Sequence, residues 1–374
     1  MSMQDIIKLS RRYGSNADFV VAGGGNTSYK EGDFLFVKAS GFALADIDES
    51  GFAKMSLPKL KIISEKKYPD NPAKREQVAL QDLMDARVEG EEKRPSVEAL
   101  LHAILPQQYI VHTHPALVNG LTCSRNGEAL TEELFGTIGV WVPIVNPGYI
   151  LAKTVKDTVS RRKMETGKDP ELIFLQNHGV FVMADSPEGI TSLYDELWGT
   201  LTDKLRRKPD FNPVSGKDVP GAEARKILSE SAEIQEKNIL FAFNKEIASF
   251  CQSPEAFVPL VKPFTPDHIV YCGPAALYIP EDSQKQDVKR LYENYIQDFG
   301  KKPKTAVWEK LGFFSLGENE KSAATAMTMF LDAVKVAVYT ESFGGFNPLP
   351  QDQIDFILNW EVEHYRAKVS LQKG

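Results

Sequence analysis

The sequence predicts an α/β protein with two domains, and three observations carry this prediction. Short apolar runs typical of strands alternate with amphipathic or capped helical segments along the chain. The length of 374 residues corresponds to two domains of ordinary size, or three. A run of turn residues without an apolar period interrupts the pattern at residues 209–221. We therefore expect a first domain over 1–208, a linker over 209–221, and a smaller second α/β domain over 222–374, whose role the sequence does not reveal.

Composition and charge narrow the class of protein. Hydrophobic residues make up 42% and charged residues 25%, which is typical of an ordinary folded globule. Because 44 Lys and Arg face 51 Asp and Glu, the net charge is −7, and the basic field that nucleic acids and anionic membranes attract is missing. The three cysteines are far apart and form no CxxC pair, which fits a reducing compartment. With neither a signal peptide nor an apolar stretch of roughly 18 residues, we predict a cytoplasmic protein without nucleic-acid or membrane partners.

Helices in the first domain are predicted from apolar spacing or caps, and strands from short apolar runs. Ser96 precedes one helix, and Ser186 with Pro187 begins another. The last two strands of this domain form a hairpin that turns at Asn177-His178-Gly179. In order, the predicted elements are a helix at 3–13, a strand at 34–38, helices at 76–87 and 96–104, strands at 109–115 and 141–145, a helix at 151–162, strands at 172–176 and 179–183, and a helix after Ser186.

Predicted strands and helices also alternate in the second domain, and one of its segments resembles a segment of the first. Residues 173–181 and 306–314 share a strand–turn–strand pattern with Gly after the turn, and a capped helix follows each. Leu311 stands where the first copy has His178. A degenerate duplication and a common motif used twice both explain this resemblance. The predicted elements are helices near 222–252, 283–298, 320–341 and 351–368, and strands at 268–272, 276–280, 305–308 and 312–316.

Histidines are concentrated where chemistry is expected. His112 and His114 lie two positions apart on a predicted strand, so both imidazoles point to the same side. His178 lies in a turn beside a glycine, where its side chain can project. Three histidines with one open position are the usual shell of a catalytic zinc ion. We predict Zn²⁺, or another divalent metal, at His112, His114 and His178; polar strand residues without a metal are the alternative.

Glu98 is the predicted catalytic residue, and it begins the helix that follows Ser96. The helix dipole favours a carboxylate at this end, next to the expected metal, where it could act as a general base. A plain capping role for Glu98 is the alternative. His102 lies one turn later on the same face, and we interpret it as a supporting or core histidine.

Three donor-rich loops indicate an anion site. Asn26 and Thr27 follow three glycines, Ser40 and Gly41 end a strand, and Ser96 begins a helix. Glycines let backbone N–H groups approach an anion closely, and the other side chains add neutral donors. We predict that these residues bind a substrate phosphate, although each motif alone is typical of a turn or a cap.

Taken together, these motifs resemble a known family. Their ordered set over roughly residues 4 to 205 is similar to the class II aldolase/adducin family, which includes L-fuculose-phosphate and L-rhamnulose-phosphate aldolases. Residues 264–272 and 359–366 resemble the aldolase part of bifunctional rhamnulose-1-phosphate aldolase/lactaldehyde dehydrogenase proteins. Because no dinucleotide fingerprint is present, we expect the dehydrogenase half to be absent.

The resemblance implies a fold and a reaction. It implies an α/β/α layered domain with a mainly antiparallel central sheet, and a homo-oligomer. It also implies a zinc-dependent lyase of carbohydrate metabolism that cleaves a ketose 1-phosphate of the L-rhamnulose or L-fuculose type to dihydroxyacetone phosphate and L-lactaldehyde. Tyr149 is a candidate site tyrosine, with a core or interface tyrosine as the alternative, and Val97 replaces a phosphate-binding serine. Sugar-phosphate epimerases, dehydratases and decarboxylases on the same scaffold are alternatives, as is a non-enzymatic adducin-like binding protein.

Overall fold

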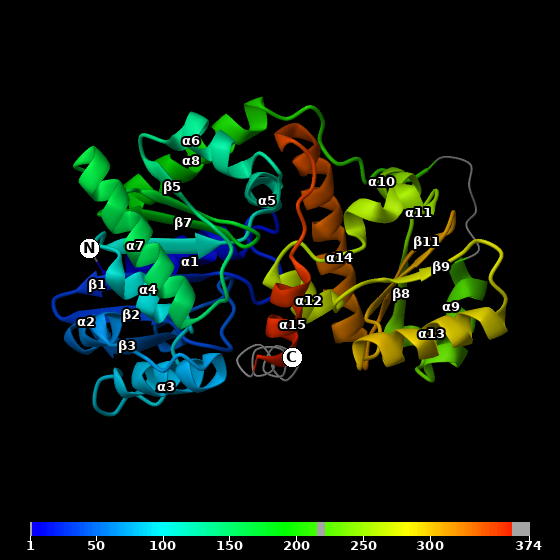
Figure 1. Ribbon diagram of the computed structural model, residues 1–374, viewed down its shortest axis with the longest axis horizontal. Coiled ribbons are helices and arrows are strands. Elements are labelled where there is room, and N and C mark those ends of the chain that lie inside the picture. The colour runs from blue at the N-terminus through cyan, green and yellow to red at the C-terminus, as the bar shows by residue number, and fades with distance from the viewer. Residues whose placement is uncertain (1, 215–220, 361–374) are drawn as a thin grey trace. The chain divides into compact units, whose positions relative to one another are not determined.

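The computed structural model describes residues 2–214 and 221–360 and divides them into two compact units (Figure 1). The first unit comprises residues 2–122 and 126–204, and the second comprises 123–125 together with the described residues from 205 onward. The predicted domain limits stay a prediction, since residues 215–220 of the proposed linker lie outside the described part. Among the described residues, no helix is both long and apolar enough to cross a membrane.

The first unit is built on a seven-stranded sheet with the order β3-β2-β1-β4-β7-β6-β5. Every neighbouring pair is antiparallel except β5 and β6, which are parallel. The prediction of a mainly antiparallel sheet is therefore confirmed. The strands are β1 (Asn26–Glu31), β2 (Phe34–Lys38), β3 (Phe52–Ser56), β4 (Tyr109–Thr113), β5 (Gly139–Val142), β6 (Leu172–Leu175) and β7 (Gly179–Ala184).

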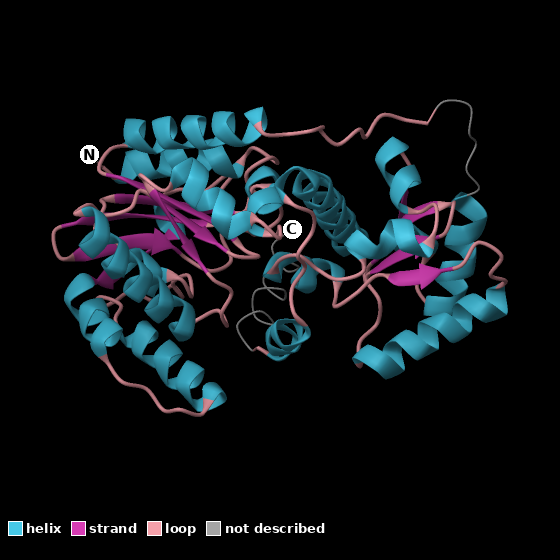
Figure 2. Ribbon diagram, turned by 45° about the horizontal axis from the view of Figure 1, so that its top comes forward, coloured by secondary structure: helices cyan, strands magenta, loops and turns pink. Residues whose placement is uncertain are grey.

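Helices cover both faces of this sheet and complete an α/β/α arrangement (Figure 2). One face carries α1 (Met3–Gly14) and α8 (Pro187–Asp203), and the other carries α2 (Leu57–Glu65), α4 (Ala99–Ile104) and α7 (Tyr149–Thr166). The amphipathic spacing of α1 buries its apolar side chains, including Ile6 and Leu9, against the sheet. The remaining helices are α3 (Pro72–Asp85), α5 (Ala116–Thr122) and α6 (Gly127–Phe135).

The second unit is a smaller α/β domain, as predicted, with a four-stranded sheet in the order β8-β11-β10-β9. Its neighbouring strands are antiparallel except β9 and β10, which are parallel. Phe314 packs in a core with helices α9 and α13, while its neighbour Phe313 stacks on Phe330 of α14, so the helices cover both faces. The elements are α9 (Gly221–Ala232), β8 (Ile239–Ala242), α10 (Lys245–Phe250), α11 (Pro254–Phe257), α12 (Pro266–Cys272), β9 (Leu277–Ile279), α13 (Lys285–Phe299), β10 (Thr305–Trp308), β11 (Gly312–Leu316), α14 (Glu320–Thr340) and α15 (Gln351–Asn359).

Several predicted elements are wrong or incomplete. Residues 268–272 form the end of helix α12, not a strand, because Thr265 caps the helix and Pro266 begins it. The predicted helix over 222–252 is interrupted, since β8 lies inside it. The sequence did not predict β1, β3, α2, α5, α6 or α11. Helix α15 ends at Asn359, and the rest of the helix predicted to 368 lies beyond the described residues apart from Trp360.

The second unit repeats the topology of half of the first. The order and directions of β4-β7-β6-β5 are matched by β8-β11-β10-β9, with a long helix before and after each hairpin. The register matches as well: His112 lies opposite Phe181 in the first sheet, as Phe241 lies opposite Phe314 in the second. Equivalent features recur at one constant sequence interval: the left-handed glycines Gly167 and Gly300, the left-handed turn residues Asn177 and Lys310, the turn glycines Gly179 and Gly312, and the helix caps Ser186 and Asn319. This agreement favours a degenerate duplication over the chance reuse of a common motif.

Candidate metal centre

Three imidazoles meet where strand β4 ends and the β6–β7 hairpin turns. One ligand nitrogen from each of His112, His114 and His178 lies within 4.8 Å of the others. The Nε2 atoms of His112 and His114 are 2.9 Å apart. The sequence therefore predicted a real cluster, which the pairing of β4 with β7 brings together across more than sixty residues of chain.

The backbone of the hairpin turn fixes the place of His178. Asn177 adopts a left-handed conformation, with φ of 57°. A Cβ atom at Gly179 would lie 2.5 Å from the carbonyl oxygen of Thr113, so only glycine lets the turn pack this closely against the end of β4. The sequence Asn-His-Gly thus places an imidazole beside the two that β4 supplies.

The backbone contact of His112 fixes which nitrogen of its ring carries the hydrogen. Its Nδ1 atom lies 3.0 Å from the backbone oxygen of Val180, which can only accept a hydrogen bond. Nδ1 therefore carries the hydrogen, and the lone pair of Nε2 faces the other histidines. Phe181 stacks on the ring at 4.0 Å between centroids and holds its plane. Such an outer contact typically orients metal-ligating histidines.

Glu98 brings a carboxylate to the same place. Its Oε2 atom lies 3.5 Å from Nε2 of His112, and its Oε1 atom lies 3.7 Å from Nε2 of His178. Burial alone raises the pKa of Glu98, but the three histidines and a hydrogen bond from Asn26 outweigh burial and lower it to about 2. Glu98 starts helix α4, yet its side chain makes no capping hydrogen bond, so the capping alternative is not supported. Three imidazole nitrogens and one carboxylate form a donor set that suits Zn²⁺ and related divalent ions.

Behind Glu98 lies a chain of buried polar side chains, of which the sequence indicated only His102, as a supporting or core histidine. Asn26 donates from Nδ2 to Oε2 of Glu98 at 2.5 Å, and its Oδ1 meets Nε2 of His102. On the other side of the ring, Nδ1 of His102 lies 2.7 Å from the hydroxyl of Ser28. The alternation of β1 places Asn26 and Ser28 on one face, but the sequence does not show that this face receives α4.

The predicted phosphate-binding residues are only partly grouped. Ser40 and Ser96 lie close together, because residues 39 and 95 form a β-bridge, and the hydroxyl of Ser96 accepts from the backbone N–H of Glu98. Gly41 follows Ser40 in a left-handed conformation. The hydroxyl of Thr27 points to the opposite face of β1, where it lies 2.6 Å from that of Ser10.

Tyr149 lies at the start of helix α7. Its hydroxyl donates to the backbone oxygen of Lys66 at 2.9 Å, and its ring packs against Tyr68 with centroids 4.5 Å apart. These contacts tie Tyr149 to the segment between α2 and α3. They give no support to its predicted role as a site tyrosine.

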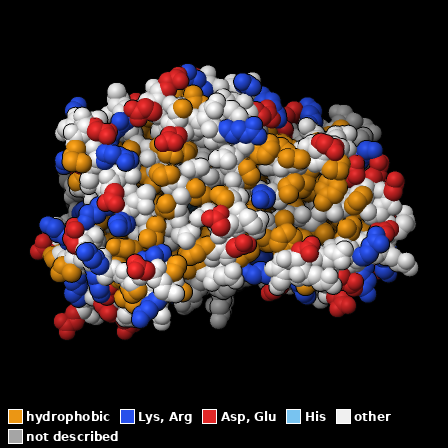
Figure 3. Space-filling view, in the orientation of Figure 1, with side chains coloured by type: hydrophobic (Ala, Val, Ile, Leu, Met, Phe, Trp, Pro, Cys, Tyr) orange, Lys and Arg blue, Asp and Glu red, His pale blue; other side chains and the backbone are white. Residues whose placement is uncertain are grey.

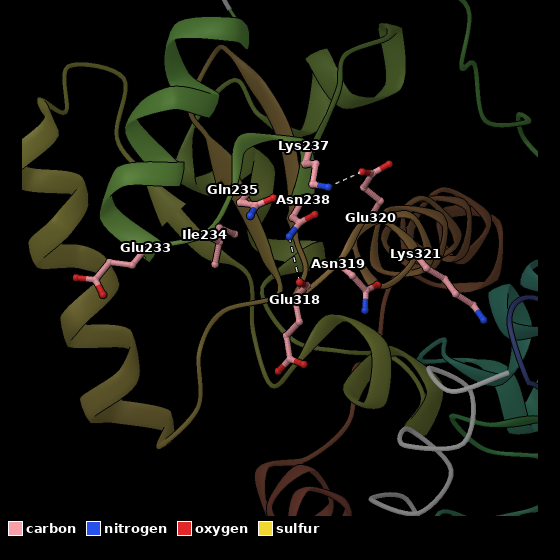
Figure 4. Close-up of a pocket in the computed structure, with 9 residues that line it drawn as sticks. All are labelled: Glu233, Ile234, Gln235, Lys237, Asn238, Glu318, Asn319, Glu320 and Lys321. Carbon is pink, nitrogen blue, oxygen red and sulfur yellow. Dashed lines mark hydrogen bonds and ion pairs between the residues drawn. The ribbon is translucent and has the colours of Figure 1, made fainter. Parts of the chain in front are cut away.

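The second unit contains a hollow of about 620 Å³ at the end of β8 and β11 opposite the β10–β11 turn (Figure 4). Three carboxylates and two lysines line it, and two of these groups, Lys237 and Glu320, form an exposed ion pair at 3.4 Å. No histidine or cysteine is among its lining residues. Figure 3 shows acidic and basic side chains on the visible face of both units, with hydrophobic side chains between them. The histidine cluster is therefore the better candidate for chemistry.

Comparison with protein-family models decides the family. Residues 4–197 match the class II aldolase and adducin N-terminal domain, and residues 221–367 match the second domain of class II aldolases. The chain belongs to the class II aldolase and adducin family. The family resemblance predicted from the ordered motifs is thereby confirmed, whereas a specific relationship to rhamnulose-phosphate aldolase/dehydrogenase proteins stays a prediction.

The individual proteins that match this chain are only distantly similar to it in sequence. An uncharacterized oxidoreductase of Bacillus subtilis (strain 168), YuxG, is 24% identical over 98% of this chain, which spans 58% of the length of that protein. The N-terminal class II aldolase domain of a conserved protein from Thermoplasma acidophilum is 27% identical, with a TM-score of 0.46, over 54% of this chain and 93% of the other. L-fuculose-1-phosphate aldolase from Thermus thermophilus is 15% identical, with a TM-score of 0.33, over 54% and 89% of the two chains.

Proposed function

We propose that this protein is a divalent-metal-dependent aldolase that cleaves a ketose 1-phosphate of the L-rhamnulose or L-fuculose type to dihydroxyacetone phosphate and L-lactaldehyde. The observation that carries the proposal is the convergence of three histidine nitrogens and the Glu98 carboxylate in a class II aldolase domain. An adducin-like binding role gives no reason for this set of side chains. Zn²⁺ is the proposed ion, because three histidines with an open position are its usual catalytic shell.

The histidines and Glu98 have different roles in the proposed reaction. His112, His114 and His178 would hold the ion, and a bound divalent cation supplies Lewis-acid polarisation of a substrate carbonyl. Glu98, ionised and next to that position, would move a proton to or from C3 of the sugar. When the C3–C4 bond breaks, its electron pair stays on C3, which gains a proton, while the C4 hydroxyl loses one and becomes the aldehyde. The proton count therefore balances without a redox cofactor or a Schiff-base lysine.

The phosphate end of the substrate is the second part of the proposal. Ser40 and Ser96 lie together beside the start of the segment that carries Glu98, and Gly41 follows Ser40 in a left-handed conformation. Neutral donors at such a position suit a phosphate oxygen. The side chains of Asn26 and Thr27 are engaged elsewhere, so the proposed phosphate contacts are those of Ser40, Gly41 and Ser96.

A substrate panel tests the proposal directly. Purified protein reconstituted with Zn²⁺ is mixed with L-rhamnulose 1-phosphate, L-fuculose 1-phosphate and pentulose phosphates, and dihydroxyacetone phosphate is measured with a coupled enzyme. We expect dihydroxyacetone phosphate from a 6-deoxyketose phosphate and its loss after chelation and dialysis. Epimerised pentulose without this product would instead identify an epimerase, and conversion of none of these substrates would refute the proposed function.

A further inference from the structure

A buried hydrogen-bond chain links strand β1 to the carboxylate of Glu98 through His102, whose ring is fully buried. We propose that His102 is a positioning residue, which sets the orientation of the Glu98 carboxylate by fixing the side-chain amide of Asn26. The kinetic part of this inference rests on the proposed sugar-phosphate cleavage, whereas its metal-binding part rests only on the proposed metal centre.

The geometry explains why this chain forms here. Side chains on one face of a strand are spaced about 6.6–6.8 Å apart, close to the 5.4 Å pitch of a helix. Side chains on one face of β1 therefore contact successive turns of α4 and the segment after it. Asn26 contacts Glu98, and Ser28 contacts His102. Lys30 donates to the backbone oxygens of Leu105 and Gln107. The helix is held along its length, with Glu98 at the end nearest the histidine cluster.

The donors and acceptors along this chain of hydrogen bonds can be assigned in only one way. The ionised carboxylate of Glu98 can only accept, so Asn26 turns its NH₂ group toward it and its Oδ1 toward His102. Oδ1 also only accepts, so Nε2 of His102 must carry the hydrogen. In a neutral ring Nδ1 is then an acceptor, and it receives the hydrogen bond from the hydroxyl of Ser28.

The opposite tautomer of His102 would undo this order. An unprotonated Nε2 would face Oδ1 of Asn26, and the amide would flip to relieve the contact between two acceptors. The flipped amide would bring its oxygen against the Glu98 carboxylate, where both atoms again only accept. The position of one hydrogen on His102 therefore determines whether Glu98 is held or repelled.

Loss of the chain should be seen at the metal site even though His102 does not belong to the three-histidine cluster. The Glu98 oxygens lie 3.5 Å and 3.7 Å from two of the proposed ligand nitrogens, so a turned carboxylate changes the surroundings of the ion. Removal of outer partners of this kind typically weakens metal affinity about 10- to 100-fold.

The test is a double-mutant cycle between His102 and Glu98. Zn²⁺ affinity is measured by competition with a chromophoric chelator for the full-length wild type, His102→Leu, His102→Gln, Glu98→Gln and the double variant Glu98→Gln/His102→Leu. We expect His102→Leu to weaken Zn²⁺ binding about 10- to 100-fold and to lower kcat more than it changes KM. His102→Gln should restore most of both, because its amide can donate to Asn26 and accept from Ser28. In the Glu98→Gln background, His102→Leu should cause no further loss.

Controls separate positioning from mere packing. Ser10→Ala also removes a buried hydroxyl contact to β1, but on the opposite face of the strand, so it should lower Tm and leave Zn²⁺ affinity and kcat unchanged. Equal losses from His102→Leu with and without Glu98 would overturn the proposal, as would wild-type Zn²⁺ affinity and kcat in His102→Leu. If His102→Leu does not fold, ¹⁵N NMR of the wild-type ring decides: Nε2 must be protonated and Nδ1 unprotonated. A protein that cleaves no sugar phosphate would refute the proposed function, while the Zn²⁺ cycle would still test His102.

Discussion

The β6–β7 turn of the first unit and the β10–β11 turn of the second have the same backbone and different chemistry. Asn177 and Lys310 both adopt left-handed conformations, with φ of 57° and 58°. Each turn then places a glycine against a neighbouring strand: a Cβ at Gly179 would lie 2.5 Å from the oxygen of Thr113, and one at Gly312 would lie 2.8 Å from that of Ala242. The shared features are those that the close packing of a hairpin requires.

The side chains around the two turns differ at the positions of the metal-binding histidines. Where the first unit has His178, the second has Leu311, and the strand register places Phe241 at the position of His112. The ring of Phe241 packs tilted against that of Phe314 with centroids 4.9 Å apart, where His112 stacks on Phe181. The comparison shows that the hairpin scaffold persists without the ligands, so the candidate site depends on a few side chains added to a general framework.

Exchanging the residues of the two turns tests directly whether the histidine accounts for the difference in metal binding. In His178→Leu the first turn acquires the side chain of the second, and we expect Zn²⁺ affinity to fall by more than about 100-fold, since a direct ligand contributes more than the outer contacts. Catalysis should fall to the level of metal-free protein. Leu311→His should bind no additional zinc, because Phe241 offers no ligand beside it. Metal analysis of both variants measures the outcome; full zinc binding by His178→Leu would contradict the assignment.

Glu98→Gln sharpens the comparison by keeping the three histidines and removing only the carboxylate. The amide has nearly the same shape but cannot take up the proton, so kcat should fall about 10²- to 10⁴-fold. KM should change less, because the phosphate contacts and the three histidine ligands remain. The measurement is steady-state kinetics on a variant of verified zinc content. A kcat within a small factor of the wild type would rule out the proton-transfer role.

Lys30 lies on β1, a strand without a counterpart in the second sheet. Its burial should make the stability of the protein depend on pH. Burial lowers the pKa of Lys30 to about 7, against about 10.4 for lysine in an unfolded chain. Between these pH values the unfolded protein holds more protons than the folded protein, so the folded state should gain stability as pH rises, by at most about 1.4 kcal/mol per unit. Below pH 7 the full penalty for burying the charge remains.

The matched variant for this test is Lys30→Met, which has a similar length and no charge. Urea unfolding at pH 7, 8 and 9 should show the wild type gaining stability relative to Lys30→Met at each step. A constant difference between the two proteins would mean that Lys30 keeps an ordinary pKa in the folded state.

The smallest expected effect concerns the two left-handed turn residues. An L-residue in this conformation costs about 1–2 kcal/mol, which glycine avoids at some cost in entropy, while Asn tolerates the conformation well. Lys310→Gly should therefore raise Tm by roughly 1–3 °C. Asn177→Gly should not, because Asn177 is also buried and its side chain would be lost. Calorimetry of both variants would reveal whether the equivalent turns carry equivalent strain.

The sequence predicted those parts of the molecule whose signals are local. The β6–β7 and β10–β11 hairpins were predicted from short apolar runs around Gly, and α8 from Ser186-Pro187. Helix α12 was mistaken for a strand because all seven of its residues are buried, which removes the helical period of polar positions. Only the cap at Thr265 and Pro266 carried the correct signal.

The candidate site divides in the same way. His112 and His114 could be paired from strand alternation, and His178 was predicted from its turn. The chain from Ser28 through His102 to Glu98 could not be predicted, because it depends on which face of β1 packs against α4. The hydroxyl of Thr27 was grouped with that of Ser40 from sequence, yet alternation within β1 turns it to the opposite face.

X-ray absorption at the metal edge of the zinc-reconstituted protein tests the central claim most directly. The account predicts one zinc per chain, bound by three imidazole nitrogens at about 2.0–2.1 Å together with oxygen ligands. In His178→Leu this signal should be lost or reduced to two imidazoles at low occupancy. Sulfur ligands near 2.3 Å, or an unchanged wild-type spectrum in His178→Leu, would contradict a metal centre built on this turn.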